Sequence, residues 1–143
     1  MNNRFFEMAN SALDADTARR DTELARRQAA EREQEEALAH NQLRLDREVQ
    51  PVFNEAVEGF NHAQVPAELL APDLNIRGPQ AGIAIGQKGQ FRATLRVKPT
   101  STGYRLYIDA NGAEDQRRVT GQDIASVLNE QLSAMVRGWY ASR

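Results

Sequence analysis

The chain has 143 residues, 41% of them apolar and only 6% aromatic, with no cysteine and a formal net charge of −2. A chain without cysteine forms no disulfides, thiolate metal sites or thiol nucleophiles. The length predicts one domain, and the shortage of large apolar residues predicts a core built from part of the chain beside a polar extension.

No apolar run approaches the roughly 20 residues that span a bilayer. Residues 1–13 lack the continuous apolar region of a secretory signal. We therefore expect a cytoplasmic protein without a membrane partner. The charge is uneven, because residues 1–62 hold 8 Arg and 13 Asp or Glu (−5), and residues 63–143 hold 10 Arg or Lys and 7 Asp or Glu (+3).

Residues 14–62 favour a long helix. Ala, Arg, Glu, Gln and Leu dominate, all strong helix formers, and glycine is absent before Gly59. Pro51 cannot donate a backbone hydrogen bond and clashes with the preceding turn. The segment is therefore either one helix or two collinear helices interrupted at Pro51.

The apolar pattern of this helix changes at Leu38, which divides the chain into a polar helical arm (1–37) and an α+β body (38–143). The stripe beyond that point is a candidate association face: Leu38, Leu45, Val49, Val52, Ala56 and Phe60. Because the arm has no such stripe to bury, it must pair with a partner, lie on another subunit or fray. Alternatively, 38–60 packs only on its own sheet and 14–37 is a solvated extension.

The start of the arm carries four large apolar residues. They are Phe5, Phe6, Met8 and Leu13. They form either a small docking patch or a terminus with incidental apolar side chains.

After two short proline-containing segments the apolar period becomes two, which is typical of strands with one buried face. Alternating segments contain Leu74 and Ile76, Ile83 and Ile85, Phe91 to Val97, and Tyr104 to Ile108, and residues 116–120 form a possible last strand. Turn residues separate these segments. We expect an antiparallel meander of three to five strands.

The C-terminal segment returns to a helical period. Thr120 with Asp123 resembles a capping box, and apolar residues from Ile124 to Tyr140 form one face. This amphipathic helix is expected to cover one face of the sheet, so the fold class is α+β.

The outer face of the meander is a candidate polyanion-binding surface. The alternation places Arg92, Arg96 and Lys98 on one side of a strand, Arg105 and Tyr107 on the same side of the next if the register is in phase, and Arg118 beside them. Basic side chains with an aromatic among them can hold phosphates and stack a base. They are equally the polar residues that any solvated strand face needs.

Ile85-Gly86-Gln87-Lys88-Gly89 resembles the Ile-Gly-x-x-Gly loop of KH domains, which clamps a nucleic-acid backbone. In that family a helix follows the loop, whereas Phe91 to Lys98 alternates like a strand. The periodicity therefore favours a glycine-rich hairpin turn. The order helix, meander, helix also resembles double-stranded-RNA-binding domains, but the last helix begins with Gln122 and Asp123 instead of a lysine cluster. We assign neither family.

The sequence contains no recognisable catalytic constellation. His40 and His62 are not spaced as metal ligands, no serine lies in a Gly-x-Ser-x-Gly motif, and there is no phosphate-binding loop. We expect no cofactor and no metal. The favoured function is a non-enzymatic protein that self-associates or docks into a larger complex through its N-terminal helix. Nucleic-acid binding by the outer sheet face is the alternative, and an enzyme is third.

Overall fold

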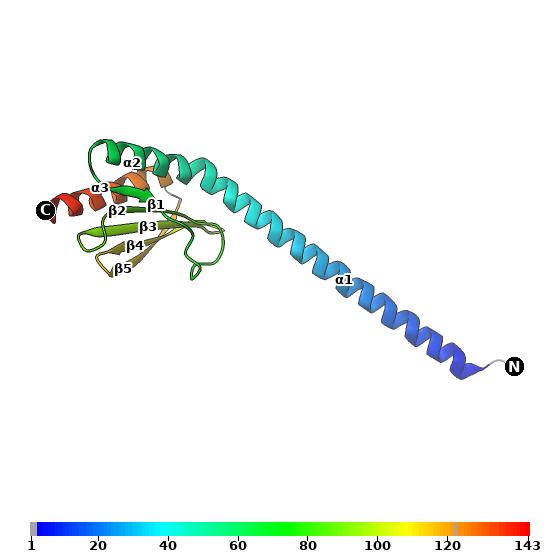
Figure 1. Ribbon diagram of the computed structural model, residues 1–143. Coiled ribbons are helices and arrows are strands. Elements are labelled where there is room, and N and C mark those ends of the chain that lie inside the picture. The colour runs from blue at the N-terminus through cyan, green and yellow to red at the C-terminus, as the bar shows by residue number, and fades with distance from the viewer. Residues whose placement is uncertain (1–2, 122) are drawn as a thin grey trace. The chain divides into compact units, whose positions relative to one another are not determined.

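The computed structural model describes residues 3–121 and 123–143 (Figure 1). The chain divides between Ala37 and Leu38 into two compact units. The elements in chain order are α1 (Arg4–Arg44), the π-helical turn η1 (Leu45–Val49), α2 (Gln50–His62), β1 (Ala67–Leu69), β2 (Ala81–Gly86), β3 (Arg92–Pro99), β4 (Gly103–Ala110), β5 (Ala113–Thr120) and α3 (Ile124–Ala141). The expected α+β class is confirmed.

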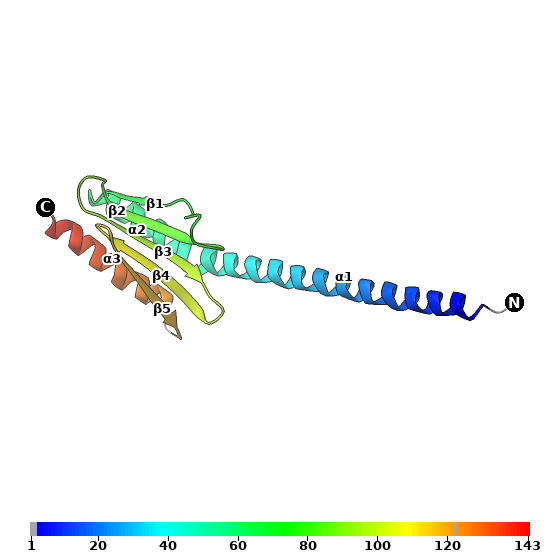
Figure 2. The same cartoon turned by 90° about the horizontal axis from the view of Figure 1, so that it is seen from below.

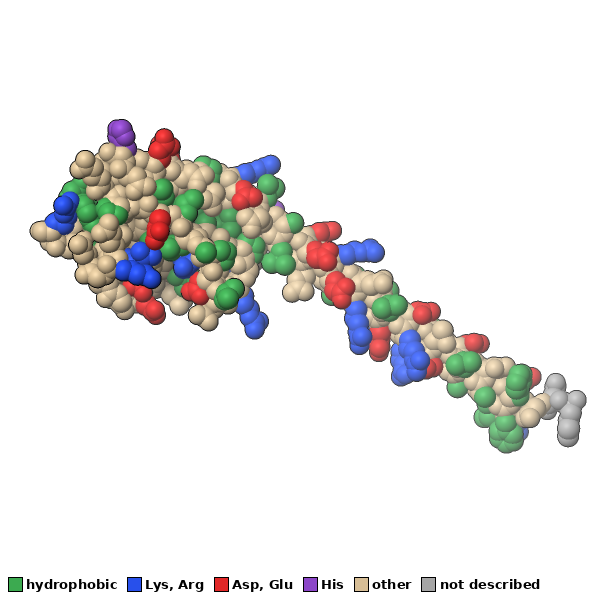
Figure 3. Space-filling model, viewed as in Figure 1, with side chains coloured by type: hydrophobic (Ala, Val, Ile, Leu, Met, Phe, Trp, Pro, Cys, Tyr) green, Lys and Arg blue, Asp and Glu red, His purple; other side chains and the backbone are tan. Residues whose placement is uncertain are grey.

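The first unit is the helical arm, and α1 has no buried residue. The Asn3 side chain caps its start by accepting hydrogen bonds from the backbone N–H groups of Phe5 and Phe6, at 3.1 and 3.4 Å. Charged side chains of both signs follow one another along the arm (Figure 3). Helix propensity and local polar contacts, such as the ion pairs of Asp16 with Arg19 and Arg20, stabilise this segment.

The helix does not stop at Pro51. The wider turn η1 ends at Val49, two residues before Pro51, and Pro51 occupies the first turn of α2. At that position the missing N–H costs nothing, because the first turn of a helix has no partner for it. The N–H of Gln50 donates to the carbonyl of Leu45, five residues back. The elements α1, η1 and α2 follow one another without a gap, so the path from α1 to α2 is helical throughout.

The second unit contains a five-stranded antiparallel sheet in the order β1-β2-β3-β4-β5 (Figure 2). Each strand pairs with its neighbour in sequence, as a meander requires. The segment from Gly86 to Gly89 joins β2 to β3. It is therefore a hairpin connection, as its periodicity predicts, and no helix follows it.

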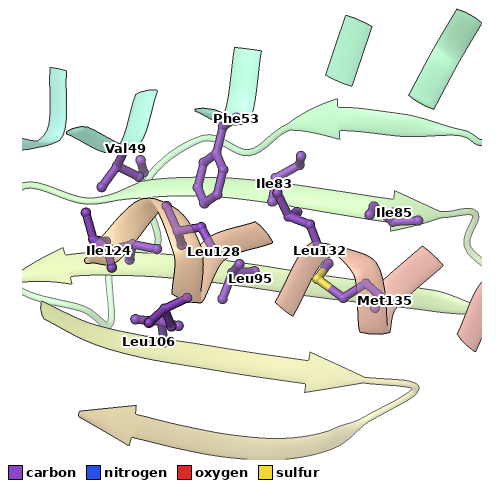
Figure 4. Packing of buried hydrophobic residues seen from close by; sticks show 14 of the residues in the cluster. Val49, Phe53, Ile83, Ile85, Leu95, Leu106, Ile124, Leu128, Leu132 and Met135 are labelled. Atoms are coloured by element: carbon purple, nitrogen blue, oxygen red, sulfur yellow. The ribbon is translucent and has the colours of Figure 1, made fainter. Parts of the chain in front are cut away.

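The core lies between one face of the sheet and the helices. Five of its side chains are fully buried and point toward one another (Figure 4): Phe53 of α2, Ile83, Leu95 and Leu106 of the strands, and Leu128 of α3. Val49 of η1 joins them. Helices α2 and α3 thus cover the same face of the sheet. The apolar face predicted for α3 packs against the core, except for Tyr140, which is exposed.

Three local expectations are wrong. The first helix begins at Arg4, ten residues before the predicted start at residue 14. Leu74 and Ile76 do not form a strand: Leu74 is 97% exposed and the Gln80 side chain binds the backbone of Asp73 and Ile76, which holds a loop. The cap of α3 is also shifted, because Asp123 itself accepts a hydrogen bond from the N–H of Ala125 at 3.1 Å.

Candidate interaction surfaces

The outer face of the sheet carries all six residues of the expected polyanion-binding surface. The register pairs Arg96 with Tyr107, Lys98 with Arg105, and Arg105 with Arg118. Because successive residues of a strand point to opposite faces, these residues and Arg92, an even number of positions from Arg96, lie on the side away from the core.

The register brings three of the six into a row across β3, β4 and β5. Lys98, Arg105 and Arg118 occupy directly opposed positions on neighbouring strands. We call this set the cationic row. In the part of the chain that the structure describes, none of the three forms an ion pair.

The other two arginines have partners within the chain. The Arg92 guanidinium lies 3.2 Å from a carboxylate oxygen of Glu68 on β1, and that of Arg96 donates to the carbonyl of Ala71 at 2.7 Å. Arg96 thereby fastens the loop after β1 over the outer face of β2. The six residues share a face, but their charges are not equally available.

The same face carries an acidic pair at its other end. Asp109 of β4 lies opposite Glu114 of β5. These residues are four positions along each strand from the cationic row, roughly 13 Å away at strand rise. The outer face is therefore divided by charge, with Tyr107 between the two ends.

The candidate association face is not one surface. Leu45 and Val49 belong to the core, at 1% and 0% exposure, and are closed to a partner. Val52, Ala56 and Phe60 are half-buried and line a groove of about 830 Å³ between α2 and α3. Leu38 is 46% exposed.

The groove is mainly apolar. Leu132 and Val136 of α3 line it from the other helix, and Glu55 and Arg137 are its charged lining residues. Its side chains offer shape and apolar surface and only a few polar groups.

A set of exposed apolar side chains lies at the start of the arm (Figure 3). Phe5, Phe6, Met8 and Leu13 are 76%, 65%, 60% and 61% exposed. We call these four residues the apolar tip. Leu24 extends it: steps of 7 and 11 residues from Phe6 to Leu13 and from Leu13 to Leu24 keep the three side chains within about 20° around the helix. The sequence analysis did not predict this alignment, although the spacing of residues 6, 13 and 24 indicates it.

A polar cluster that sequence reasoning did not find joins the helical segment to the sheet. Arg44 donates to the carbonyls of Thr100 and Gly103, both at 2.8 Å, and its guanidinium lies 4.6 Å from the centre of the Tyr104 ring. The Tyr104 hydroxyl donates to Glu48. No local pattern marks these residues, because the partners are more than 50 positions apart in the chain.

The environment of Tyr104 raises its pKa to about 12. Burial is the largest cause, followed by the hydrogen bond to Glu48 and the negative charge of that carboxylate, while Arg44 acts in the opposite direction. Tyr104 therefore remains a neutral donor well above neutral pH.

Residues 3–121 and 123–143 contain no group of three or more His, Asp or Glu side chains arranged to hold a metal ion. His40 and His62 are both exposed. Over the same residues, no helix has the length and apolar character needed to cross a membrane.

Comparison of the chain with protein-family models, with curated proteins and with solved structures finds no match. The fold defines an α+β protein with a long N-terminal helix. A function for it is therefore proposed from the surfaces described above.

Proposed function

We propose that this chain is a non-enzymatic assembly protein that self-associates through its N-terminal arm. The observation that carries the proposal is the apolar tip, four large side chains each at least 60% exposed on a helix that buries nothing. A cytoplasmic location is part of the same proposal.

A helix without tertiary packing is marginal in water, because nucleation is unfavourable and each hydrogen bond adds little. Local ion pairs contribute a few tenths of a kcal/mol each, and those of Asp16 with Arg19 and Arg20 are exposed. A helix of this kind gains most from burying apolar surface against another helix.

The tip provides such a surface. Contiguous exposed apolar side chains on a soluble protein mark interaction sites more often than isolated ones do. Phe6, Leu13 and Leu24 share one side of the helix, so an antiparallel or parallel second arm can bury them together. A second copy of the chain supplies the same residues and is the simplest partner, since most soluble oligomers contain identical subunits.

The experiment is the absolute mass of the full chain by light scattering over a range of concentrations. The test variant is Phe5→Ala/Phe6→Ala, which keeps the helix and removes half of the tip. The matched control is Gln28→Ala/Gln34→Ala, two polar changes farther along the same helix. We expect oligomers for the wild-type and control chains and monomers for the tip variant.

A fragment of residues 38–143 gives a second measurement. All residues of the buried core lie within it, so we expect it to fold and to be monomeric. If the fragment forms an oligomer with the same number of copies as the full chain, the interface lies in the body and the proposal is overturned. A full chain that is monomeric at every concentration would overturn self-association.

A further inference from the structure

We propose that the outer face of the sheet is a binding site for single-stranded nucleic acid. The cationic row of Lys98, Arg105 and Arg118 would hold phosphates, and Tyr107 would stack a base. This site is independent of the arm and does not rest on self-association.

The three cations of the cationic row repel one another. Like charges directly opposite on neighbouring strands destabilise a sheet, and here two such pairs follow one another, Lys98 with Arg105 and Arg105 with Arg118. Neighbouring strands are about 4.8 Å apart, so the three positions span roughly 10 Å. An anion with several charged groups would relieve this repulsion, and a single small anion would reach only part of the row.

The availability of these charges is the second argument. Within the described residues, no carboxylate lies within 4.0 Å of the cationic row. By contrast, Arg92 on the same face is paired with Glu68. The chain thus neutralises a cation at one end of β3 and leaves the other end open to a ligand.

The aromatic neighbour is the third argument. Tyr107 lies two residues from Arg105 on β4 and opposite Arg96 on β3, and it is half-buried. An aromatic ring on a sheet beside cations stacks unpaired bases, and this stacking tolerates any base sequence. Bases in a duplex are already stacked, so this contact favours a single strand.

The acidic pair limits the ligand further. Asp109 and Glu114 lie on the same face beyond Tyr107. A single backbone along the cationic row would avoid them, whereas the second backbone of a duplex lying across the face would meet their charges. Width and charge therefore both favour one strand.

The experiment measures the fluorescence anisotropy of a labelled thymidine oligomer of about 15 nucleotides, long enough for such a site, as the full chain is added. The same oligomer in duplex form and a uridine RNA oligomer serve as comparison ligands. The test variant is Arg105→Ala/Arg118→Ala, with Lys98→Gln as a second variant at the other end of the row.

Each cation that contacts a single strand contributes a slope of about 0.7 in the dependence of affinity on salt. The double variant should therefore lower this slope by about 1.4. If wild type and variant bind equally at 1 M salt, where these contacts contribute least, this slope weakens binding of the variant about 25-fold at about 0.1 M salt. Tyr107→Ala should weaken binding of the single strand and leave the salt slope unchanged.

The matched control is Arg117→Ala. Arg117 is the neighbour of Arg118 on β5 but points to the opposite face, because it pairs with the core residue Leu106. This control should bind like the wild type. The proposal is overturned if the single strand does not bind at low salt, if the duplex binds more tightly, or if Arg117→Ala weakens binding as much as the double variant does. It is also overturned if the row variants change the oligomeric mass and leave oligonucleotide affinity unaltered, because the row would then be a protein interface.

Discussion

The guanidinium of Arg44 lies over the Tyr104 ring, 4.6 Å from its centre. From this position it donates to two backbone carbonyls of the turn between β3 and β4, those of Thr100 and Gly103. One side chain thus satisfies two acceptors and covers an aromatic face. These contacts connect the end of α1 to the β3–β4 hairpin.

Replacing Arg44 by Met should destabilise the protein by about 1.5–3 kcal/mol, the range for hydrogen bonds to a charged group. The reason is that the carbonyl of Thr100 loses the donor that Arg44 provides, and the carbonyl of Gly103 keeps only the N–H of Thr100. The apolar stem of the side chain is kept. Denaturant unfolding measures the change. Arg47→Met, an exposed residue of η1, is the control and should cost about 0.5 kcal/mol or less. Equal losses for both variants would show that the contacts of Arg44 have no special weight.

The raised pKa of Tyr104 predicts a loss of stability in alkaline solution. Its pKa in the folded protein is about 12, above its value of about 10 in an unfolded chain. A raised pKa means that folding favours the protonated form, so this contribution is fully present below pH 10 and is lost as pH rises toward 12. The free energy of unfolding, measured at intervals between pH 9 and about 12, should fall over this window.

Tyr104→Phe is the variant that isolates this effect. It removes the hydroxyl that binds Glu48 and leaves the ring against Arg44. The difference in stability between wild type and variant should be constant below pH 10 and should shrink above it. A difference that does not depend on pH would contradict the assignment.

The turn between β2 and β3 contains two glycines with different constraints. Gly86 and Gly89 both have positive φ, +97° and +84°. A Cβ on Gly86 would collide with the carbonyl of Phe91, while one on Gly89 meets nothing within 4 Å. Gly89→Ala should therefore cost only the conformational penalty, about 1–2 kcal/mol.

Gly86→Ala should cost more than Gly89→Ala, because backbone must move in addition. Thermal unfolding of the two variants makes the comparison, and both should keep the wild-type circular dichroism spectrum if they fold. Equal unfolding temperatures would show that the turn relaxes freely around Gly86.

Two phenylalanines separate stability from association. Phe53 is 0% exposed and Phe5 is 76% exposed. Phe53→Ala should destabilise the body by about 3–5 kcal/mol, since it removes a large buried side chain. Phe5→Ala should change stability by about 0.5 kcal/mol or less. Unfolding measured at a concentration where the chain is monomeric keeps association out of the comparison, and a large loss for Phe5→Ala would mean that the arm packs within the chain.

The sequence by itself determined the local features of this protein. Helix propensity up to His62, alternation along β3 and β4, and the apolar face of α3 are repeating patterns of neighbouring residues, and each predicts its element from short-range physics. The period of two also predicted that Arg96 and Lys98 share the solvated face. The expectation for Leu74 and Ile76 failed because two apolar residues do not distinguish a strand from a loop held by Gln80.

Only the tertiary structure decided which distant residues meet. Register placed Arg105 between Lys98 and Arg118, and a shift by one residue would have sent Arg105 to the core face. Leu45 and Val49 are buried in the core of the same chain, although their spacing was equally compatible with packing against a partner helix. The physical reason is the same in each case: these contacts depend on which segments come together in the folded chain, and residues far apart carry no shared local pattern that records it.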